Sequence, residues 1–136
     1  MEYTENGRLT VRTYAASGGY PVGDAIVRIR GTDEENRFEE YSLITDENGL
    51  TETILLPTPS KAYSLQPKQP EIPFARYNVD IEKVGYYSKR IYNVSVFSGI
   101  DSYLPVNMIP QDNDSVSNTR PSGNLNAIVT QNDKLN

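Results

Sequence analysis

Residues 20–31 read Tyr-Pro-Val-Gly-Asp-Ala-Ile-Val-Arg-Ile-Arg-Gly, and this stretch decides the fold that the sequence predicts. Pro21 fixes its own φ, Gly23 can adopt a positive φ, and Asp24 can hydrogen-bond the backbone ahead of it. A tight turn is therefore expected, followed by a strand over positions 25–30. One face of that strand carries Ala25, Val27 and Ile29, and the other carries Ile26, Arg28 and Arg30. Such a strand, launched from a Pro/Gly turn, is typical of an antiparallel β-sandwich.

Composition narrows the chemistry that the chain can perform. The 136 residues suffice for one domain with tails, and the formal net charge of -5 disfavours nucleic acid and anionic membranes as partners. The chain contains no Cys and no His. Disulfides, thiolate metal sites and cysteine nucleophiles are therefore excluded, as are imidazole bases and His-containing triads. We expect no cofactor.

The sequence also lacks targeting signals. No run approaches the roughly 18 apolar residues that a membrane helix needs. The first five residues have neither the positive start nor the apolar core of a signal peptide. We therefore expect a soluble chain, synthesised in the cytoplasm and not inserted in a membrane.

Alternating apolar residues and turn residues predict six further strands. Positions 1–7 are polar, which predicts a short N-terminal arm. Strands are expected at 8–15, 37–45, 50–56, 76–84, 91–97 and 103–109. Strand 37–45 carries charges among its apolar residues, which is typical of a sheet edge, and Pro105 makes the last strand an edge as well. Ile91 is out of phase with the residues that follow it, which predicts a bulge near Asn93.

Two segments lie outside the predicted sheets. Residues 57–73 are rich in proline, which forbids a central strand and favours an extended loop. The prolines are Pro57, Pro59, Pro67, Pro70 and Pro73. Positions 111–136 are rich in Asn, Asp and Ser and predict a disordered tail, although positions 124–130 are β-prone and could add a strand to a sheet edge.

The order of these signals resembles the transthyretin-like, carboxypeptidase-regulatory-like β-sandwich superfamily. The family pattern is Leu-x-Val, Pro-Val-x-x-Ala-x-Val, Thr-Asp-x-x-Gly, Tyr-x-Val-x-Ile, Gly-Tyr and a closing apolar strand. The matching residues are Leu9, Val11, Pro21, Val22, Ala25, Val27, Thr45, Asp46, Gly49, Tyr77, Val79, Ile81, Gly85, Tyr86, Leu104, Val106 and Met108. The resemblance implies an all-β, seven-stranded, two-sheet antiparallel β-sandwich with Greek-key connections over positions 8–110.

The second half is similar to a module of clostridial proteins that accompanies peptidoglycan-binding domains and spore cortex-lytic enzymes. The similar stretches are 56–59, 63–65, 73–77, 85–87 and 104–110. The resemblance implies an accessory module, because in such proteins the hydrolase lies elsewhere.

Two other relatives of the superfamily fit less well. The transthyretin-like ureide hydrolases rely on His and on a C-terminal Tyr-Arg-Gly-Ser, and this chain has neither. Collagen-adhesin B-type domains often carry a Lys–Asn crosslink. Asn107 is suitably placed for one, but the first strand offers Arg8 and Arg12 instead of Lys.

Three groups of residues are candidates for a site. Asp46–Gly49 resembles part of a calcium loop, but it lacks the alternating ligands of one and predicts a hairpin turn. The carboxylates of Asp33–Glu35 and Glu39–Glu40 could serve glycoside hydrolysis, but the absence of Trp and of an evident cleft favours a solvated face. Among the tyrosines, Tyr77 and Tyr92 are predicted to lie in the core. Those in or beside turns could contact protein or sugar, namely Tyr20, Tyr41, Tyr63, Tyr86, Tyr87 and Tyr103.

We therefore expect a non-catalytic module that mediates protein–protein assembly or attachment in a bacterial cell-envelope or spore setting. The residues predicted to make contacts are Tyr20, Tyr63, Tyr86, Tyr87, Tyr103, Pro57, Pro59, Pro67 and Pro70. Two alternatives stay open. One is a peptidoglycan- or carbohydrate-binding domain that uses turn tyrosines. The other is a spore or phage-like structural protein that self-assembles by strand addition through positions 124–130.

Overall fold

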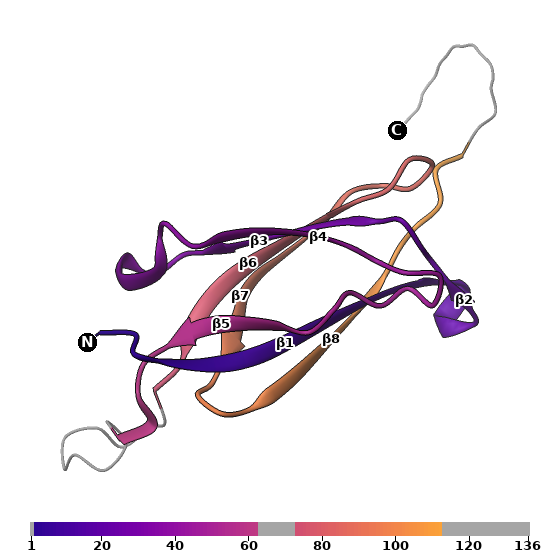
Figure 1. Ribbon diagram of the computed structural model, residues 1–136. Coiled ribbons are helices and arrows are strands. Elements are labelled where there is room, and N and C mark those ends of the chain that lie inside the picture. Colours follow the sequence, from indigo (N-terminus) through magenta and orange to yellow (C-terminus); the bar gives the residue numbers. More distant parts are fainter. Residues whose placement is uncertain (1, 63–72, 113–136) are drawn as a thin grey trace.

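The computed structural model describes residues 2–62 and 73–112. Within these residues eight strands form two four-stranded sheets that pack face to face, which confirms the all-β sandwich (Figure 1). The strands are β1 (Glu5–Ala15), β2 (Tyr20–Pro21), β3 (Ile26–Gly31), β4 (Glu40–Ile44), β5 (Ile54–Thr58), β6 (Ala75–Glu82), β7 (Lys89–Val96) and β8 (Asp101–Asn107). Two short 3-10 helices, η1 (Ala16–Gly18) and η2 (Glu34–Asn36), lie in connections. The predictions for Tyr63, Pro67, Pro70 and positions 113–136 lie outside the described residues.

Strand β1 is the centre of the first sheet. Its first half pairs antiparallel with β5, and its last two residues pair with β2. β8 lies along the other side of β1, because Arg8 and Leu9 pair with both β5 and β8. The β1–β8 pair is parallel, so the prediction of a wholly antiparallel sandwich is wrong at this point. The cause is the β7–β8 turn, which begins β8 beside the start of β1, where the Gly99 amide donates to the Asn6 carbonyl at 2.8 Å.

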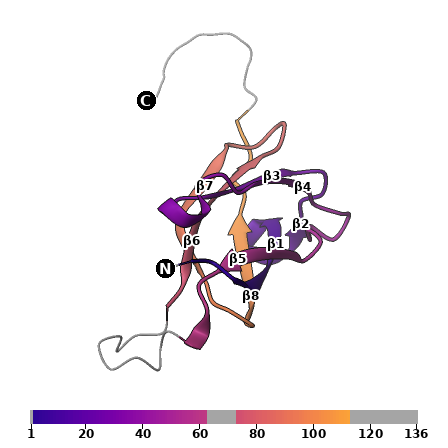
Figure 2. The ribbon, with the colours of Figure 1, turned by 60° about the vertical axis from the view of Figure 1, so that its left-hand side comes forward.

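The second sheet has the order β4-β3-β6-β7 and is antiparallel throughout (Figure 2). β4 is an edge strand, as predicted for positions 37–45. The predicted bulge is confirmed, since the β6–β7 register shifts between Tyr77 and Val79 and Asn93 has a φ of 57°. The bulge resets the alternation in β7, so Ile91 packs against the core. Tyr92 points outward and is 64% exposed, which makes the prediction that it lies in the core wrong.

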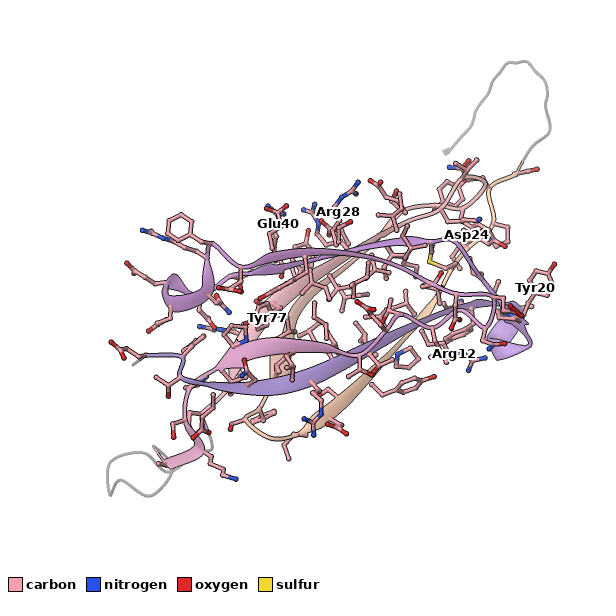
Figure 3. All side chains as sticks on the ribbon, in the orientation of Figure 1. Arg12, Tyr20, Asp24, Arg28, Glu40 and Tyr77 are labelled. Atoms are coloured by element: carbon pink, nitrogen blue, oxygen red, sulfur yellow. The ribbon has the colours of Figure 1, made fainter. Side chains whose placement is uncertain are left out.

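The core lies between the two sheets and follows the predicted alternation. Three strands contribute most of it: Leu9 and Val11 from β1, Val27 and Ile29 from β3, and Tyr77, Val79 and Ile81 from β6 are all buried. Tyr77 lies between the layers (Figure 3), and its hydroxyl donates to the Pro57 carbonyl at 2.6 Å. The Tyr77 hydroxyl, the polar group of the largest side chain in the core, is therefore hydrogen-bonded.

Two buried threonines hold the turn that precedes β3. The hydroxyls of Thr13 and Thr45 both donate to the Val22 carbonyl, at 2.6 and 2.9 Å. The Ala25 amide in turn donates to the Thr45 hydroxyl at 2.9 Å. Thr13 lies in β1 and Thr45 directly follows β4, so segments that are distant in the sequence meet at the Val22 carbonyl.

The turn itself differs from the sequence prediction in two ways. The positive φ belongs to Asp24, at 57°, and not to Gly23. Gly23 is needed for space, because an added Cβ would lie 2.8 Å from the Asp46 carbonyl oxygen. The Asp24 carboxylate makes no hydrogen bond to the described residues, so the predicted contact with the backbone ahead is also wrong.

Element boundaries differ from prediction in two strands of the first sheet. β1 begins at Glu5, within the predicted arm. Gly7 is buried in it, and only glycine fits there, because an added Cβ would lie 2.3 Å from the Phe97 carbonyl oxygen. β5 continues through Pro57 to Thr58, beyond the predicted start of the proline-rich loop. Pro57 is tolerated there because β5 is an edge strand. No helix in the described part is long and apolar enough to cross a membrane.

We predict that Gly49→Ala destabilises the protein far more than Gly99→Ala. Both glycines have a positive φ, 78° and 73°, which costs any other residue roughly 1–2 kcal/mol. At Gly49 an added Cβ would also lie 2.2 Å from the Thr13 carbonyl oxygen, whereas at Gly99 nothing lies within 4 Å. Urea denaturation should show a clear excess loss for Gly49→Ala. Equal losses would contradict the packing described for the β4–β5 turn.

Candidate binding surfaces

The outward side of the first sheet combines aromatic, apolar and cationic side chains. We call it the first-sheet face. Its members are Arg8, Thr10, Arg12 and Tyr14 from β1, Leu55 from β5, and Asp101, Tyr103 and Pro105 from β8. The register places Leu55 opposite Arg8, Tyr103 opposite Thr10 and Pro105 opposite Arg12. Leu55 and Tyr103 are each 55% exposed, so large apolar side chains stand open in the middle of this face.

The polar groups of the first-sheet face are only partly paired. Arg8 Nε bonds Asp101 Oδ1 at 2.6 Å. The hydroxyls of Thr10 and Thr53 are 2.7 Å apart and hydrogen-bonded. The Arg12 guanidinium lies 5.7 Å from the centre of the Tyr14 ring and forms no ion pair with the described residues. A guanidinium stacked on an aromatic ring keeps its donors available for a further acceptor.

The outward side of the second sheet is different, because its charges pair with one another. Arg28 Nη1 bonds Glu82 Oε1 at 3.0 Å, and Arg90 Nε bonds Asp80 Oδ1 at 2.5 Å. Arg30 approaches the same Asp80 carboxylate at 3.9 Å. Arg28 and Glu40 point away from the sandwich in Figure 3. These exposed pairs run across β3, β6 and β7 and form a solvated face, where each pair adds little stability.

The structure does not gather the predicted tyrosines into one site. Tyr20 is 63% exposed in β2, at one end of the sandwich (Figure 3), and Tyr103 lies on the first-sheet face. Tyr86 packs against the core, whereas its neighbour Tyr87 is 53% exposed in the β6–β7 hairpin. Among the described prolines of the predicted contact set, Pro57 is half-buried within β5 and Pro59 is buried, which leaves Pro59 little surface for a partner.

Sequence reasoning missed Leu55, Arg12 and Tyr14 as surface candidates. The alternation of positions 8–15 did place Arg12 and Tyr14 on the outward side of a strand. The alternation does not show which residues of the neighbouring strands lie beside them. Leu55 joins this face because β5 pairs with β1 in one particular register.

The predicted acidic cluster near Asp33 is structural. The Asp33 carboxylate is buried and accepts from the Tyr3 hydroxyl at 2.7 Å and from the Arg76 amide and Nε at 2.8 Å each. Asn36 completes the network by donating to the Arg76 carbonyl at 3.1 Å. Burial, and then the bond to Asp33, raise the pKa of Tyr3 above its usual range. With three donors on it, this carboxylate ties the N-terminus to η2 and β6.

Asp46 and Glu39, the other candidate carboxylates, also have local structural roles. Asp46 Oδ1 accepts from the amides of Asn48 and Leu50, at 2.9 and 3.0 Å, which confirms the hairpin turn. Glu39 accepts a hydrogen bond from the Tyr41 hydroxyl. In the parts of the chain that the structure describes, no three His, Cys, Asp or Glu residues are grouped to hold a metal ion.

Comparison with known proteins yields structural likeness only. No protein-family model and no curated protein matches the chain. A 3-chlorocatechol 1,2-dioxygenase from Rhodococcus opacus 1CP is similar at a TM-score of 0.55 and 14% identity, over 81% of this chain and 62% of that one. Catechol 1,2-dioxygenase from Acinetobacter sp. ADP1 is similar at 0.51 and 13%, over 88% and 58%. The Bacillus anthracis TIE protein matches at 0.48 and 15%, over 78% and 17%.

The chain thus spans less than two thirds of each of these proteins. At such identities the dioxygenase matches support the β-sandwich fold and carry no information about activity.

We predict that alkaline pH destabilises the protein through its partly buried phenols. Burial, and then the bond to Glu39, raise the pKa of Tyr41 from 10.0 to about 12. Burial likewise raises the pKa of Tyr77 above its usual range. Because these folded pKa values exceed the unfolded ones, the stabilisation is intact below about pH 10 and is lost as pH rises through each folded value.

Urea midpoints measured between about pH 9 and about pH 12 test this expectation. Tyr41→Phe should flatten the decline, and Glu39→Gln should flatten it less, since burial remains. A decline of identical slope in wild type and Tyr41→Phe would contradict it.

Proposed function

We propose that this chain is a non-catalytic β-sandwich module that assembles with another protein through the first-sheet face. The contrast between the two outward faces carries the proposal. The arginines on the outward side of β3 and β7 each lie by a carboxylate, whereas the first-sheet face leaves the Arg12 guanidinium without an ion pair among the described residues, beside the exposed Tyr103 and Leu55. Tyr and Arg dominate the energetics of protein interfaces, and depletion of charge marks their centres.

The non-catalytic part of the proposal is supported by the inventory of reactive groups. The chain has no His and no Cys. Asp33, the most deeply buried of the described carboxylates, is saturated by donors from Tyr3 and Arg76. The resemblance to modules of clostridial envelope and spore proteins supports a cell-envelope or spore setting as part of the same proposal.

Docking on a face is favoured over strand addition at an edge. In the described part, Pro105 interrupts the outer edge of β8, Pro57 interrupts β5, and the bulge at Asn93 twists β7. Proline and bulges on edge strands are devices that discourage further pairing. Self-assembly through positions 124–130 is therefore the less favoured form of assembly.

A second candidate function is binding of cell-wall carbohydrate. The observation that favours it is the Tyr103 ring, which lies opposite Thr10 and its hydroxyl partner Thr53. An aromatic surface beside hydroxyls and a guanidinium suits a sugar as well as a peptide. Sedimentation with purified peptidoglycan distinguishes the two, because the assembly function predicts that the protein stays in the supernatant.

Capture of partners from envelope and spore fractions tests the assembly function. Tyr103→Ser and Leu55→Ser should each weaken capture by about tenfold or more, as expected for hot-spot residues. Phe38→Ser is the matched control, because Phe38 is 85% exposed in the β3–β4 connection, away from this face. Equal effects of all three substitutions, or none, would refute the proposed surface.

A further inference from the structure

A groove lies beside the β6–β7 hairpin, on the outward side of the second sheet. Its volume is about 340 Å³, and its walls are Asp24, Ile26, Glu82, Lys83, Val84 and Ser88. We call it the hairpin groove. A neighbouring hollow of about 330 Å³ shares Glu82 and Ser88 with it and continues along β7. Together they form a shallow channel across the end of the sheet that is farthest from the β7–β8 turn.

Two of the residues that line the hairpin groove, Ile26 and Val84, are apolar. Ile26 pairs in register with Ile44, so both side chains stand on the outward face, and Ile44 is 63% exposed. Val84 is 96% exposed, because the Tyr86 amide bonds the Lys83 carbonyl at 3.0 Å and leaves Val84 at the corner of the turn. Ile26 and Val84 thus line the groove, and Ile44, next to Ile26 on β4, extends this apolar strip at the edge of the sheet.

The groove is preformed, because a third segment braces the hairpin. The Tyr87 amide donates to the Ile109 carbonyl at 2.9 Å, and the Gln111 amide donates to the Gly85 carbonyl at 2.8 Å. Figures 1 and 2 both show the segment after β8 alongside this hairpin. A hairpin held in this way loses little conformational entropy on binding, so the cost of ordering it reduces the binding free energy less.

The charges of the groove are unevenly paired. Glu82 is held by Arg28 at 3.0 Å. The Asp24 carboxylate has neither a hydrogen bond nor an ion pair with any described residue, and its backbone is left-handed at a φ of 57°. Asp46 lies next to Thr45, whose carbonyl accepts from the Asp24 amide at 2.9 Å, and adds negative charge at this end. The Asp24 carboxylate (labelled in Figure 3) therefore lines the same groove as Ile26 and Val84, without a partner of its own among the described residues.

We propose that the hairpin groove binds an extended segment of a partner protein in which a Lys or Arg lies beside one or two aliphatic residues. The aliphatic side chains cover Ile44, Ile26 and Val84, and the cation pairs with Asp24. Lys83, at the rim, repels the cation and fixes the direction in which the segment lies. This inference rests on the proposed assembly function, since it names a second contact of the same module.

A membrane fits these observations less well. Lipid surfaces attract clusters of several Lys and Arg residues, whereas Lys83 is the only cation among the described residues that line this groove, and Arg90 in the adjoining hollow is paired with Asp80. The net charge of -5 and the carboxylates of Asp24 and Asp46 would repel an anionic bilayer.

The test uses the full chain and two capped octapeptides. One has Arg-Val-Leu at its centre, and the other has Glu-Val-Leu and is otherwise identical. Fluorescence anisotropy at low salt should give about tenfold tighter binding of the Arg peptide. Asp24→Asn should abolish most of that preference, and Asn tolerates the left-handed backbone well. Glu34→Gln changes the net charge equally at an exposed residue of η2, beyond the opposite end of β3 from Asp24, and should leave the preference intact. Lys83→Gln should tighten the Arg peptide, and Val84→Ser should weaken both.

Several outcomes would overturn the inference. Equal affinity for both peptides would do so, as would equal losses in Asp24→Asn and Glu34→Gln. Tighter peptide binding after Arg120→Gln or Lys134→Gln would identify a cation of this chain itself as the occupant. Binding to phosphatidylserine vesicles that Val84→Ser abolishes would reassign the hairpin to a membrane. The wild-type protein could also show no preference for the Arg peptide while Tyr103→Ser still weakens capture of partner proteins. That result would refute binding in the hairpin groove and leave the proposed function standing.

Discussion

The buried carbonyl of Val22 is the point on which the sandwich depends. The hydroxyls of Thr13 in β1 and of Thr45, just after β4, donate to it at 2.6 and 2.9 Å. A buried polar group without a partner costs more free energy than one hydrogen bond returns, so this arrangement admits few alternatives. It fixes the corner at which the chain leaves the first sheet and enters the second. With no disulfide in the chain, that corner sets how the two layers stack and where β3 points its charged side.

Much of the fold could be predicted because most strands have one buried face. The alternation in β1, β3 and β6 identified the inward residues correctly, from Leu9 to Ile81. Prediction failed where a distant contact decides the outcome. Gly23 is selected by the nearby Asp46 carbonyl rather than by its own φ, and the bulge at Asn93 turns Tyr92 outward. The parallel direction of β8 follows from where β7 ends, which local periodicity does not contain.

The candidate surfaces were harder to predict than the fold. Composition and position in turns favour the tyrosines as contact residues, but Tyr86 packs inward and Tyr20 and Tyr103 lie on separate elements. The first-sheet face depends on registers that bring Leu55 beside Arg8 and Tyr103 beside Thr10. The hairpin groove depends on a turn that exposes Val84 and on a carboxylate left without a partner. The same residue types scattered on a solvated loop would not indicate a binding surface.

The parallel pairing of β1 and β8 has a mechanical consequence. The two strands run side by side from Arg8 opposite Asp101 to Tyr14 opposite Asn107. A pull applied between the start of β1 and the end of β8 is directed along both strands. It therefore loads every hydrogen bond between them at once instead of opening them one by one. Resistance to such a pull is set by the rate of unfolding and not by equilibrium stability. Tension applied between these two points is therefore resisted by the β1–β8 hydrogen bonds in shear.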